Sequence, residues 1–186
     1  MSITPRLRHA TLDDVTEIRA LIDRSVRGMS RGIYTDAEID ESLVSVFGVD
    51  SQLLEDGTYF VIECDGEIAA SGGWSKRATL YGGDQMKQGS DPLLDPAVDA
   101  ARIRAFYVAP QWARRGLARM LYGACEAAAV ADGFRRFQLG ATLPGIPLYE
   151  ALGFRALGRA DFPMRFGLTL GIMRMERGIP TQTGEP

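Results

Sequence analysis

Residues 101–120 read ARIRAFYVAPQWARRGLARM, and the rest of the chain is organised around this stretch. The segment from Ile103 to Val108 is rich in β-branched and aromatic residues and predicts a strand, which Pro110 stops because proline cannot donate to a ladder. After two arginines, Gly116 begins a helix whose apolar positions recur at helical spacing: Leu117, Met120, Leu121, Ala124 and Ala128. A strand that turns directly into a helix leaves unpaired backbone N–H groups at the helix start. Together with the helix dipole, these groups favour an anion such as phosphate.

This turn matches neither of the two commonest phosphate-binding loops. It lacks the Gly-x-x-x-x-Gly-Lys-Ser/Thr pattern of a Walker loop and the Gly-x-Gly-x-x-Gly pattern of a Rossmann loop. The run from Arg114 to Ala118, RRGLA, instead resembles the pyrophosphate loop of the GNAT superfamily of N-acetyltransferases, whose pattern is Gln/Arg-x-x-Gly-x-Gly/Ala. Gly116 and Ala118 fit this pattern, whereas Ala113 stands where the family usually has Gln or Arg. Taken alone, the loop also fits an ordinary surface turn with two solvated arginines.

A second match, one helix and one strand later, makes the resemblance more specific. Residues 148–154 read LYEALGF and resemble the family's helix end, where a tyrosine, here Tyr149, precedes the pair Gly153-Phe154 that opens the next strand. The resemblance covers the chain from its first strand to about Glu176. It implies an α/β (α+β) fold with a mixed, mostly antiparallel central sheet and helices on both faces. It also implies that the strands at 103–108 and 134–141 are parallel neighbours that splay apart around acetyl-CoA.

The composition indicates a single domain. With 186 residues, 46% hydrophobic and 24% charged, the chain can bury a sizeable core. We expect one N-acetyltransferase domain over residues 1–176 and a disordered tail over 177–186.

The net charge of −3 argues against sequence-independent nucleic-acid binding, and no stretch resembles a signal peptide or a membrane span. We therefore expect a cytoplasmic protein with no nucleic-acid or membrane partner, and a homodimer remains open.

The chain has two cysteines and one histidine, and these few residues limit its possible metal and redox chemistry. In a reducing cytoplasm, Cys64 and Cys125 are expected to be buried as small apolar residues, although a disulfide remains open. With His9 as the only histidine and two cysteines far apart in sequence, no metal-ligand set is expected. His9 ends the first strand and is interpreted as structural.

The local patterns predict alternating strands and helices along the chain. Asp65-Gly66 is a two-residue hairpin signal, and Asp132-Gly133 is a helix end. A Gly- and Ser-bearing loop is expected at 27–34, and a long irregular segment at 76–99 is of the kind that often serves a site. The expected strands are 4–9, 58–64, 67–74, 103–108, 134–141, 154–160 and 168–176; the expected helices are 11–26, 35–47, 49–55, 116–132 and 144–152.

The resemblance implies an acetyl-CoA-dependent N-acetyltransferase in which an amine of a small molecule or peptide attacks the thioester directly. A non-catalytic acyl-CoA-binding sensor or interaction module of the same fold is the alternative. The coenzyme is expected to be held by the residues of the turn: Arg114, Arg115, Gly116, Leu117, Ala118 and Arg119. The thioester carbonyl is expected to meet backbone N–H groups at a bulge in the central strand, with Phe106, Tyr107 and Val108 as candidates. A strand buried on both faces explains the same run.

Tyr149 is the candidate catalytic residue. A tyrosine near pKa ~10 is a weak acid toward a thiolate near ~8.5. We therefore expect its hydroxyl to stabilise the departing thiolate by a hydrogen bond. The alternative is a tyrosine buried at a helix end, with its hydroxyl satisfied by backbone.

The proton acceptor is not evident from the sequence. Some family members carry a glutamate early in the central strand, but this region reads Arg102-Ile103-Arg104. The remaining candidates are a water chain or acids that are equally explained as solvated side chains: Asp84, Asp95, Asp99 and Glu63. Three aromatic residues are expected either to border the acceptor pocket or to pack in the core: Trp74, Tyr81 and Tyr34.

Overall fold

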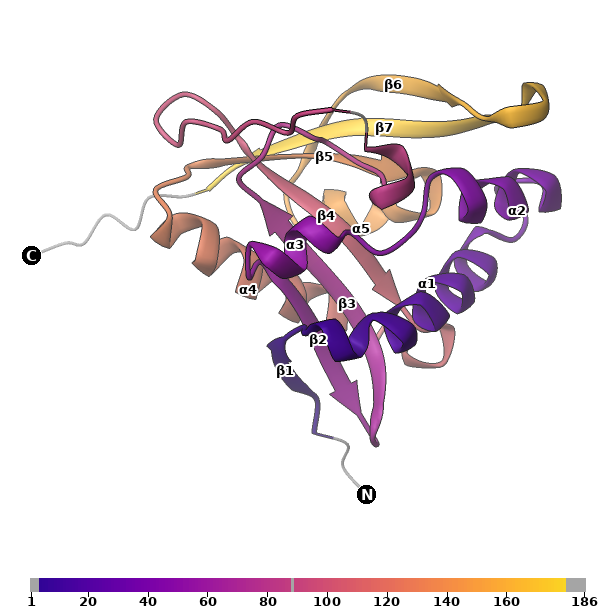
Figure 1. Cartoon of the computed structure of the whole chain (residues 1–186), viewed down its shortest axis with the longest axis horizontal. Coiled ribbons are helices and arrows are strands. Elements are labelled where there is room, and N and C mark those ends of the chain that lie inside the picture. Colours follow the sequence, from indigo (N-terminus) through magenta and orange to yellow (C-terminus); the bar gives the residue numbers. More distant parts are fainter. Residues whose placement is uncertain (1–3, 88, 180–186) are drawn as a thin grey trace, which may run out of the picture.

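The strands of the chain form one mixed sheet, which Figure 1 shows extending through the whole molecule. The computed structural model describes residues 4–87 and 89–179. The strand order is β1-β2-β3-β4-β5-β7-β6, and every neighbouring pair is antiparallel except β4 and β5. The strands are β1 (Arg6–His9), β2 (Tyr59–Cys64), β3 (Glu67–Ser75), β4 (Ala101–Val108), β5 (Arg136–Thr142), β6 (Arg155–Pro163) and β7 (Thr169–Gly178).

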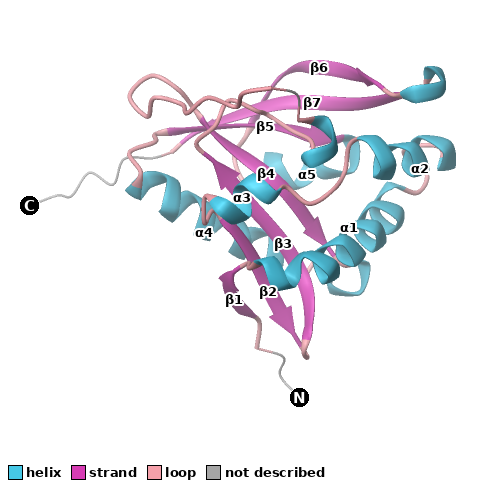
Figure 2. Cartoon of the chain, in the orientation of Figure 1, coloured by secondary structure: helices cyan, strands magenta, loops and turns pink. Residues whose placement is uncertain are grey.

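Helices cover both faces of the sheet, as predicted (Figure 2). They are α1 (Val15–Ser30), α2 (Asp36–Ser45), α3 (Ser51–Glu55), α4 (Leu117–Ala131) and α5 (Ile146–Ala151). Helix α1 packs on β3 and β4, and α4 packs on β2, β3 and β4 from the opposite side. The inner face of α4 follows a strict four-residue spacing of fully buried or nearly buried residues: Leu117, Leu121, Cys125 and Ala129. Both cysteines, Cys64 and Cys125, are buried and free.

Strands β4 and β5 separate after a short parallel contact. Their ladder joins only Ala101 to Phe137 and Arg102 to Gln138. Beyond these pairs, the edge of β4 that faces β5 has no strand partner within the described residues. The predicted splay is therefore confirmed, and it opens the sheet where β4 ends.

A bulge in β4 increases this divergence. Arg104 is paired with Gly73 and Tyr107 with Ser71, so three steps on β4 oppose two on β3, and Ala105 takes a left-handed conformation with φ +55°. A bulge was considered for Phe106, Tyr107 and Val108, and the structure places it at Ala105 and Phe106, where that run begins. Opposite it, Gly72 is required, because a Cβ there would lie 2.4 Å from the Phe106 ring.

Several element boundaries differ from prediction by a few residues, and two of these differences concern the predicted loop at 27–34 and the predicted tail. Helix α1 continues to Ser30 through the expected loop, because Gly28 lets the helix lie against Pro110; a Cβ at Gly28 would be 2.3 Å from that ring. Strand β7 continues to Gly178, so the first two residues assigned to the tail belong to the sheet. The rest of the tail prediction, from residue 180 onward, lies outside the described residues.

The long connection between β3 and β4 is tied to the body of the protein. Its two limbs bond to each other where the Ala78 N–H donates to the Pro92 carbonyl (3.0 Å) and the Leu94 N–H to the Lys76 carbonyl (2.8 Å). The Arg77 guanidinium pairs with the Asp56 carboxylate at 2.7 Å. Within 4–87 and 89–179, no helix has the length and apolar character needed to cross a bilayer.

Candidate active site

The turn before α4 presents unpaired backbone donors at the surface. The first α4 hydrogen bond runs from the Met120 N–H to the Gly116 carbonyl (3.0 Å), so the N–H groups of residues 117–119 have no partner within the helix, and no side chain caps it. Arg114 and Gly116 are left-handed, with φ +63° and +83°. Alternation of left- and right-handed residues turns successive N–H groups toward one side, which forms an anion-binding concavity. A Cβ at Gly116 would meet nothing within 4 Å, so the space over this turn is open.

The side chains of the turn differ in whether they already contact other parts of the protein. Arg115 stacks on the Trp112 ring, with its guanidinium carbon 4.9 Å from the ring centroid. Arg114 and Arg119 are exposed, whereas Leu117 is buried and anchors the helix start in the core. The donors are therefore fixed in place by a buried side chain and remain accessible from outside.

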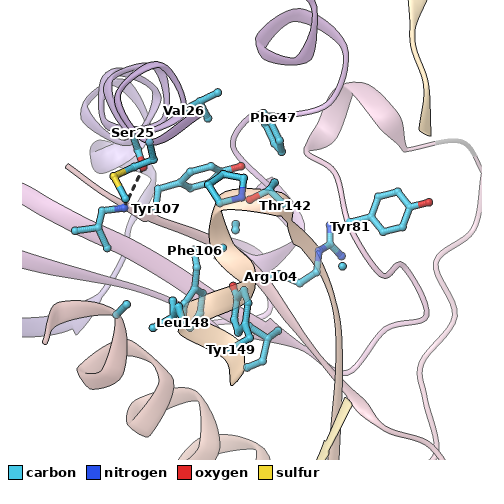
Figure 3. A pocket seen from close by; sticks show the side chains of 18 of the residues that line it. Ser25, Val26, Phe47, Tyr81, Arg104, Phe106, Tyr107, Thr142, Leu148 and Tyr149 are labelled. Carbon is cyan, nitrogen blue, oxygen red and sulfur yellow. Dashed lines mark hydrogen bonds between the residues drawn. The ribbon is translucent and has the colours of Figure 1, made fainter. Parts of the chain in front are cut away.

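A cavity of about 210 Å³ lies where β4 and β5 diverge (Figure 3). Ala118, in the first turn of α4, is part of its wall and connects it to the anion-binding turn. The bulged end of β4 forms one side and α1 covers it. The residues that line the cavity are Ser25, Val26, Met29, Ser30, Phe47, Gly48, Leu80, Tyr81, Gly82, Ile103, Arg104, Ala105, Phe106, Tyr107, Val108, Ala118, Gly140, Thr142, Pro144, Gly145, Leu148 and Tyr149.

Tyr149, on α5, points its hydroxyl into this cavity (Figure 3). Its ring is fixed by a T-shaped contact with Phe154 (centroids 5.7 Å apart) and a tilted contact with Phe106 (6.4 Å). Gly153, with φ +88°, lets the chain reverse so that the Phe154 N–H reaches the Tyr149 carbonyl at 2.9 Å. The hydroxyl has no hydrogen-bond partner among the described residues, and burial raises the pKa of Tyr149 above its ordinary value. The alternative of a hydroxyl satisfied by backbone is thus not what the structure has.

The backbone amides at the bulge differ in their availability. Tyr107 pairs with Ser71, and the Ala109 N–H donates to the Ala69 carbonyl, so by the two-residue alternation of a strand the Val108 N–H faces away from β3. It donates to the Ser25 hydroxyl oxygen at 3.2 Å, drawn as the dashed line in Figure 3. Sequence reasoning missed Ser25; its only signal was a small polar residue on the apolar face of α1.

Arg104 is the second residue that sequence reasoning missed. The side chain is buried, and it pairs with the equally buried Asp50 carboxylate at 2.8 Å. It also donates to the carbonyls of Thr79 (2.9 Å) and Gly82 (2.6 Å), and so holds the loop that carries Tyr81 against the cavity. Asp50 is further paired with the Lys87 ammonium.

The acids considered as a general base all lie outside the cavity lining. Asp84 accepts from the Ser51 N–H (3.0 Å) and pairs with Lys87 (3.2 Å). Asp95 and Asp99 shape their own turn, in which the Asp95 N–H donates to the Asp99 carboxylate at 2.8 Å. Glu63 lies at the β1–β2 edge and pairs with Arg8 and Arg6. These four acids are therefore engaged in ion pairs or turn hydrogen bonds away from the cavity, rather than simply solvated as the alternative had it.

Of the three aromatic residues considered for the acceptor wall, only Tyr81 lines the cavity. Trp74 packs edge-on against Phe134 with centroids 5.9 Å apart. The Tyr34 hydroxyl donates to the Gly171 carbonyl (2.7 Å) and accepts from the Leu143 N–H (2.8 Å). His9 lies against Phe60 (4.6 Å between centroids). Core packing therefore explains Trp74 and Tyr34, whereas His9 is an exposed residue whose ring lies on Phe60.

Comparison with known proteins agrees with this architecture. Residues 18–154 match the model of the acetyltransferase (GNAT) family. No curated protein matches the sequence significantly. Among solved structures, a GCN5-related N-acetyltransferase from Rhodopseudomonas palustris is similar with a TM-score of 0.69 and 17% identity, over 96% of this chain and 99% of that one.

Two further structures show the same fold at low identity. The PaiA N-acetyltransferase from Thermoplasma acidophilum, solved with coenzyme A, has a TM-score of 0.63 and 12% identity, covering 94% of this chain and 99% of its own. The ribosomal-protein-S18-alanine N-acetyltransferase from Escherichia coli has a TM-score of 0.60 and 15% identity, covering 98% and 99%.

Proposed function

The chain belongs to the GNAT family of acetyltransferases, and on this premise we propose that it is an N-acetyltransferase that moves the acetyl group of acetyl-CoA to a primary amine. The acceptor is a small molecule or a peptide, and the amine attacks the thioester directly. The observation that carries the proposal is the unpartnered Tyr149 hydroxyl. It points into a cavity whose wall also contains the first turn of α4 at Ala118.

The turn from Arg114 to Arg119 holds the coenzyme diphosphate in this proposal. The support is the set of N–H groups at residues 117–119, which have no partner in the helix, and the open space over Gly116. Each charge–dipole contact at a helix N-terminus is worth about 0.3–1 kcal/mol, so binding needs several such contacts acting together. The exposed guanidinium groups of Arg114 and Arg119 add charge pairing to phosphate oxygens.

The bulged end of β4, at Phe106, Tyr107 and Val108, faces the thioester in this proposal. The Val108 N–H already orients the Ser25 hydroxyl, whose own proton is free to be donated into the cavity. That hydroxyl supplies a hydrogen bond to the carbonyl oxygen as negative charge develops on it. The Tyr149 hydroxyl donates to the sulfur as the carbon–sulfur bond breaks.

A non-catalytic coenzyme-binding module is the second candidate. The observation that favours it is that no Asp, Glu or His is among the described residues that line the cavity. Release of free thiol from acetyl-CoA, measured over a panel of amines, separates the two. Coenzyme A that stabilises the protein without any amine-dependent thiol release would leave only the binding module.

A further inference from the structure

In the part of the chain that the structure describes, the cavity lining contains no group that can remove a proton from an ammonium ion. Among the described lining residues, the titratable groups are Arg104 and three tyrosines, Tyr81, Tyr107 and Tyr149. Burial raises the pKa of both Tyr107 and Tyr149, so these phenols stay protonated near neutral pH. A guanidinium and neutral phenols are proton donors rather than bases.

The acids just beyond the lining are already engaged. Asp50 lies behind Arg104 and is held between Arg104 and Lys87. A second hollow adjoins the cavity at Phe47 and Gly48, and its charged residues are Arg19, Asp23 and Asp84. There Asp23 pairs with Arg27, and Asp84 pairs with Lys87.

A protonated amine entering this cavity would lose hydration without gaining a counter-ion. Burying an ammonium ion is costly unless it is paired, and the nearest fixed charge in the wall is the Arg104 guanidinium. Aromatic faces do attract ammonium ions, but that attraction leaves the nitrogen protonated and therefore unable to attack. The amine must accordingly be neutral before it binds.

The lining of the cavity is suited to a flat, apolar ligand such as an aromatic ring. Four aromatic rings enter the lining from three segments of the chain: Phe47 after α2, Tyr81 in the β3–β4 loop, and Phe106 and Tyr107 in β4. Phe47 and Tyr107 meet edge to face with centroids 6.3 Å apart, which leaves ring faces and edges for an aromatic ligand. In the proposed function the cavity of about 210 Å³ also receives the acetyl thioester, and since about 150 Å³ admits benzene, the acceptor beside the acetyl group is limited to a single ring.

We propose that the acceptor is an aromatic amine of low basicity, with the amino group attached directly to the ring so that it is uncharged at neutral pH. This inference rests on the proposed acetyltransferase function and names the substrate class of the same site. The amine nitrogen forms the bond to the carbonyl carbon, and the carbon–sulfur bond breaks with its electron pair passing to sulfur. The proton released from nitrogen passes through water to the thiolate, so the products are the N-aryl acetamide and coenzyme A.

Two isomeric acceptors test the proposal directly. The compounds 4-methylaniline and benzylamine have the same atoms and nearly the same size, but only benzylamine is protonated at pH 7. We expect kcat/KM, measured by thiol release, to be at least about tenfold higher for 4-methylaniline and independent of pH from 6.5 to 8.5. For benzylamine, kcat/KM should rise about tenfold per pH unit over this range, because only its neutral fraction reacts.

A matched pair of variants tests whether the missing base is what limits turnover of a protonated amine. Thr142 lines the cavity and precedes a short 3-10 turn, a position that Asp and Asn both accept. Thr142→Asp adds a carboxylate base and Thr142→Asn adds the same shape without one. We expect the ratio of benzylamine to 4-methylaniline turnover to be at least about tenfold higher in Thr142→Asp than in Thr142→Asn.

The outcomes separate this inference from the proposed function. Equal or faster turnover of benzylamine with a flat pH profile would overturn the substrate class and leave the acetyltransferase intact. The same ratio in both Thr142 variants would also overturn it. If neither amine released thiol while coenzyme A still raised the melting temperature, the acetyltransferase proposal itself would fall.

Discussion

Replacing Tyr149 with phenylalanine removes the one hydroxyl on which the proposed chemistry depends and leaves the ring in place. The ring keeps its contacts with Phe106 and Phe154, and the hydroxyl has no protein partner to lose among the described residues. A hydrogen bond to a charged group is worth about 1.5–3 kcal/mol. If it is made only to the departing thiolate, kcat should fall about 10- to 150-fold, since each 1.36 kcal/mol is a factor of ten.

The same structure predicts almost no change in stability or coenzyme affinity for Tyr149→Phe. The ring contacts remain and the hydroxyl gives up no hydrogen bond within the described residues, so we expect a change within about 0.5 kcal/mol, which is below about 2 °C in the melting temperature of a domain this size. Because burial raises the pKa of Tyr149, its hydroxyl stays protonated through the usual assay range and should add no basic limb to the pH profile of kcat.

The matched control for this substitution is Tyr122→Phe. Tyr122 also packs edge-on against Phe154, with centroids 5.8 Å apart, but its hydroxyl is buried away from the cavity and has no partner among the described residues. This variant should keep the wild-type kcat. An unchanged kcat in Tyr149→Phe, or equal losses in both variants, would refute the role of the Tyr149 hydroxyl.

Three further predictions concern the turn, the buried ion pair and acid stability. Gly116→Val places a β-branched side chain at φ +83° in the space proposed for the diphosphate. The variant should therefore lose the roughly 2.7 kcal/mol of stabilisation that coenzyme A gives at one hundred times its Kd, whereas a thermal shift retained in full would show that the phosphates bind elsewhere. Arg104→Met leaves the Asp50 carboxylate without its guanidinium partner and should cost about 3–5 kcal/mol in urea unfolding. Adding Asp50→Leu should restore at least half of that loss, and a purely additive double variant would contradict the pairing. The Arg8 guanidinium lowers the pKa of Asp14 from 3.8 to about 2. The folded-state pKa is depressed, so this stabilisation is present above pH 3.8 and is lost as the pH falls toward 2. The difference in unfolding free energy between the wild type and Asp14→Asn should disappear over that range, and a difference that persists unchanged at pH 2 would rule out this linkage.

The order of strands and helices could be predicted because short local sequence patterns determine where each element begins and ends. The Asp65-Gly66 turn has φ +50° and +82°, the two left-handed residues that a tight hairpin needs, and Asp132-Gly133 ends α4 with Gly133 at φ +94°. The extension of α1 through Gly28 was not predictable in this way. A glycine that breaks a helix and a glycine that lets a helix approach Pro110 look alike until the partner is known.

The turn at Gly116 and the helix end at Tyr149 could be predicted for the same reason, and the wall of the cavity could not. The turn at Gly116 and the Tyr149 helix end are short segments in which a few adjacent residues fix the backbone. The cavity wall is assembled from α1, the end of α2, the β3–β4 loop and β5. Ser25 reaches Val108 across 83 residues of sequence, and no local pattern encodes that contact.

Arg104 gives a physical reason why no acid is found among the described residues that line the cavity. It stands in the stretch of the central strand where other family members carry a glutamate, and its burial requires a full set of partners. Asp50 is the carboxylate partner of this guanidinium and is not among the residues that line the cavity. The arginine that fixes the β3–β4 loop therefore pairs with an acid outside the cavity lining, and the proposed mechanism passes the amine's proton to water.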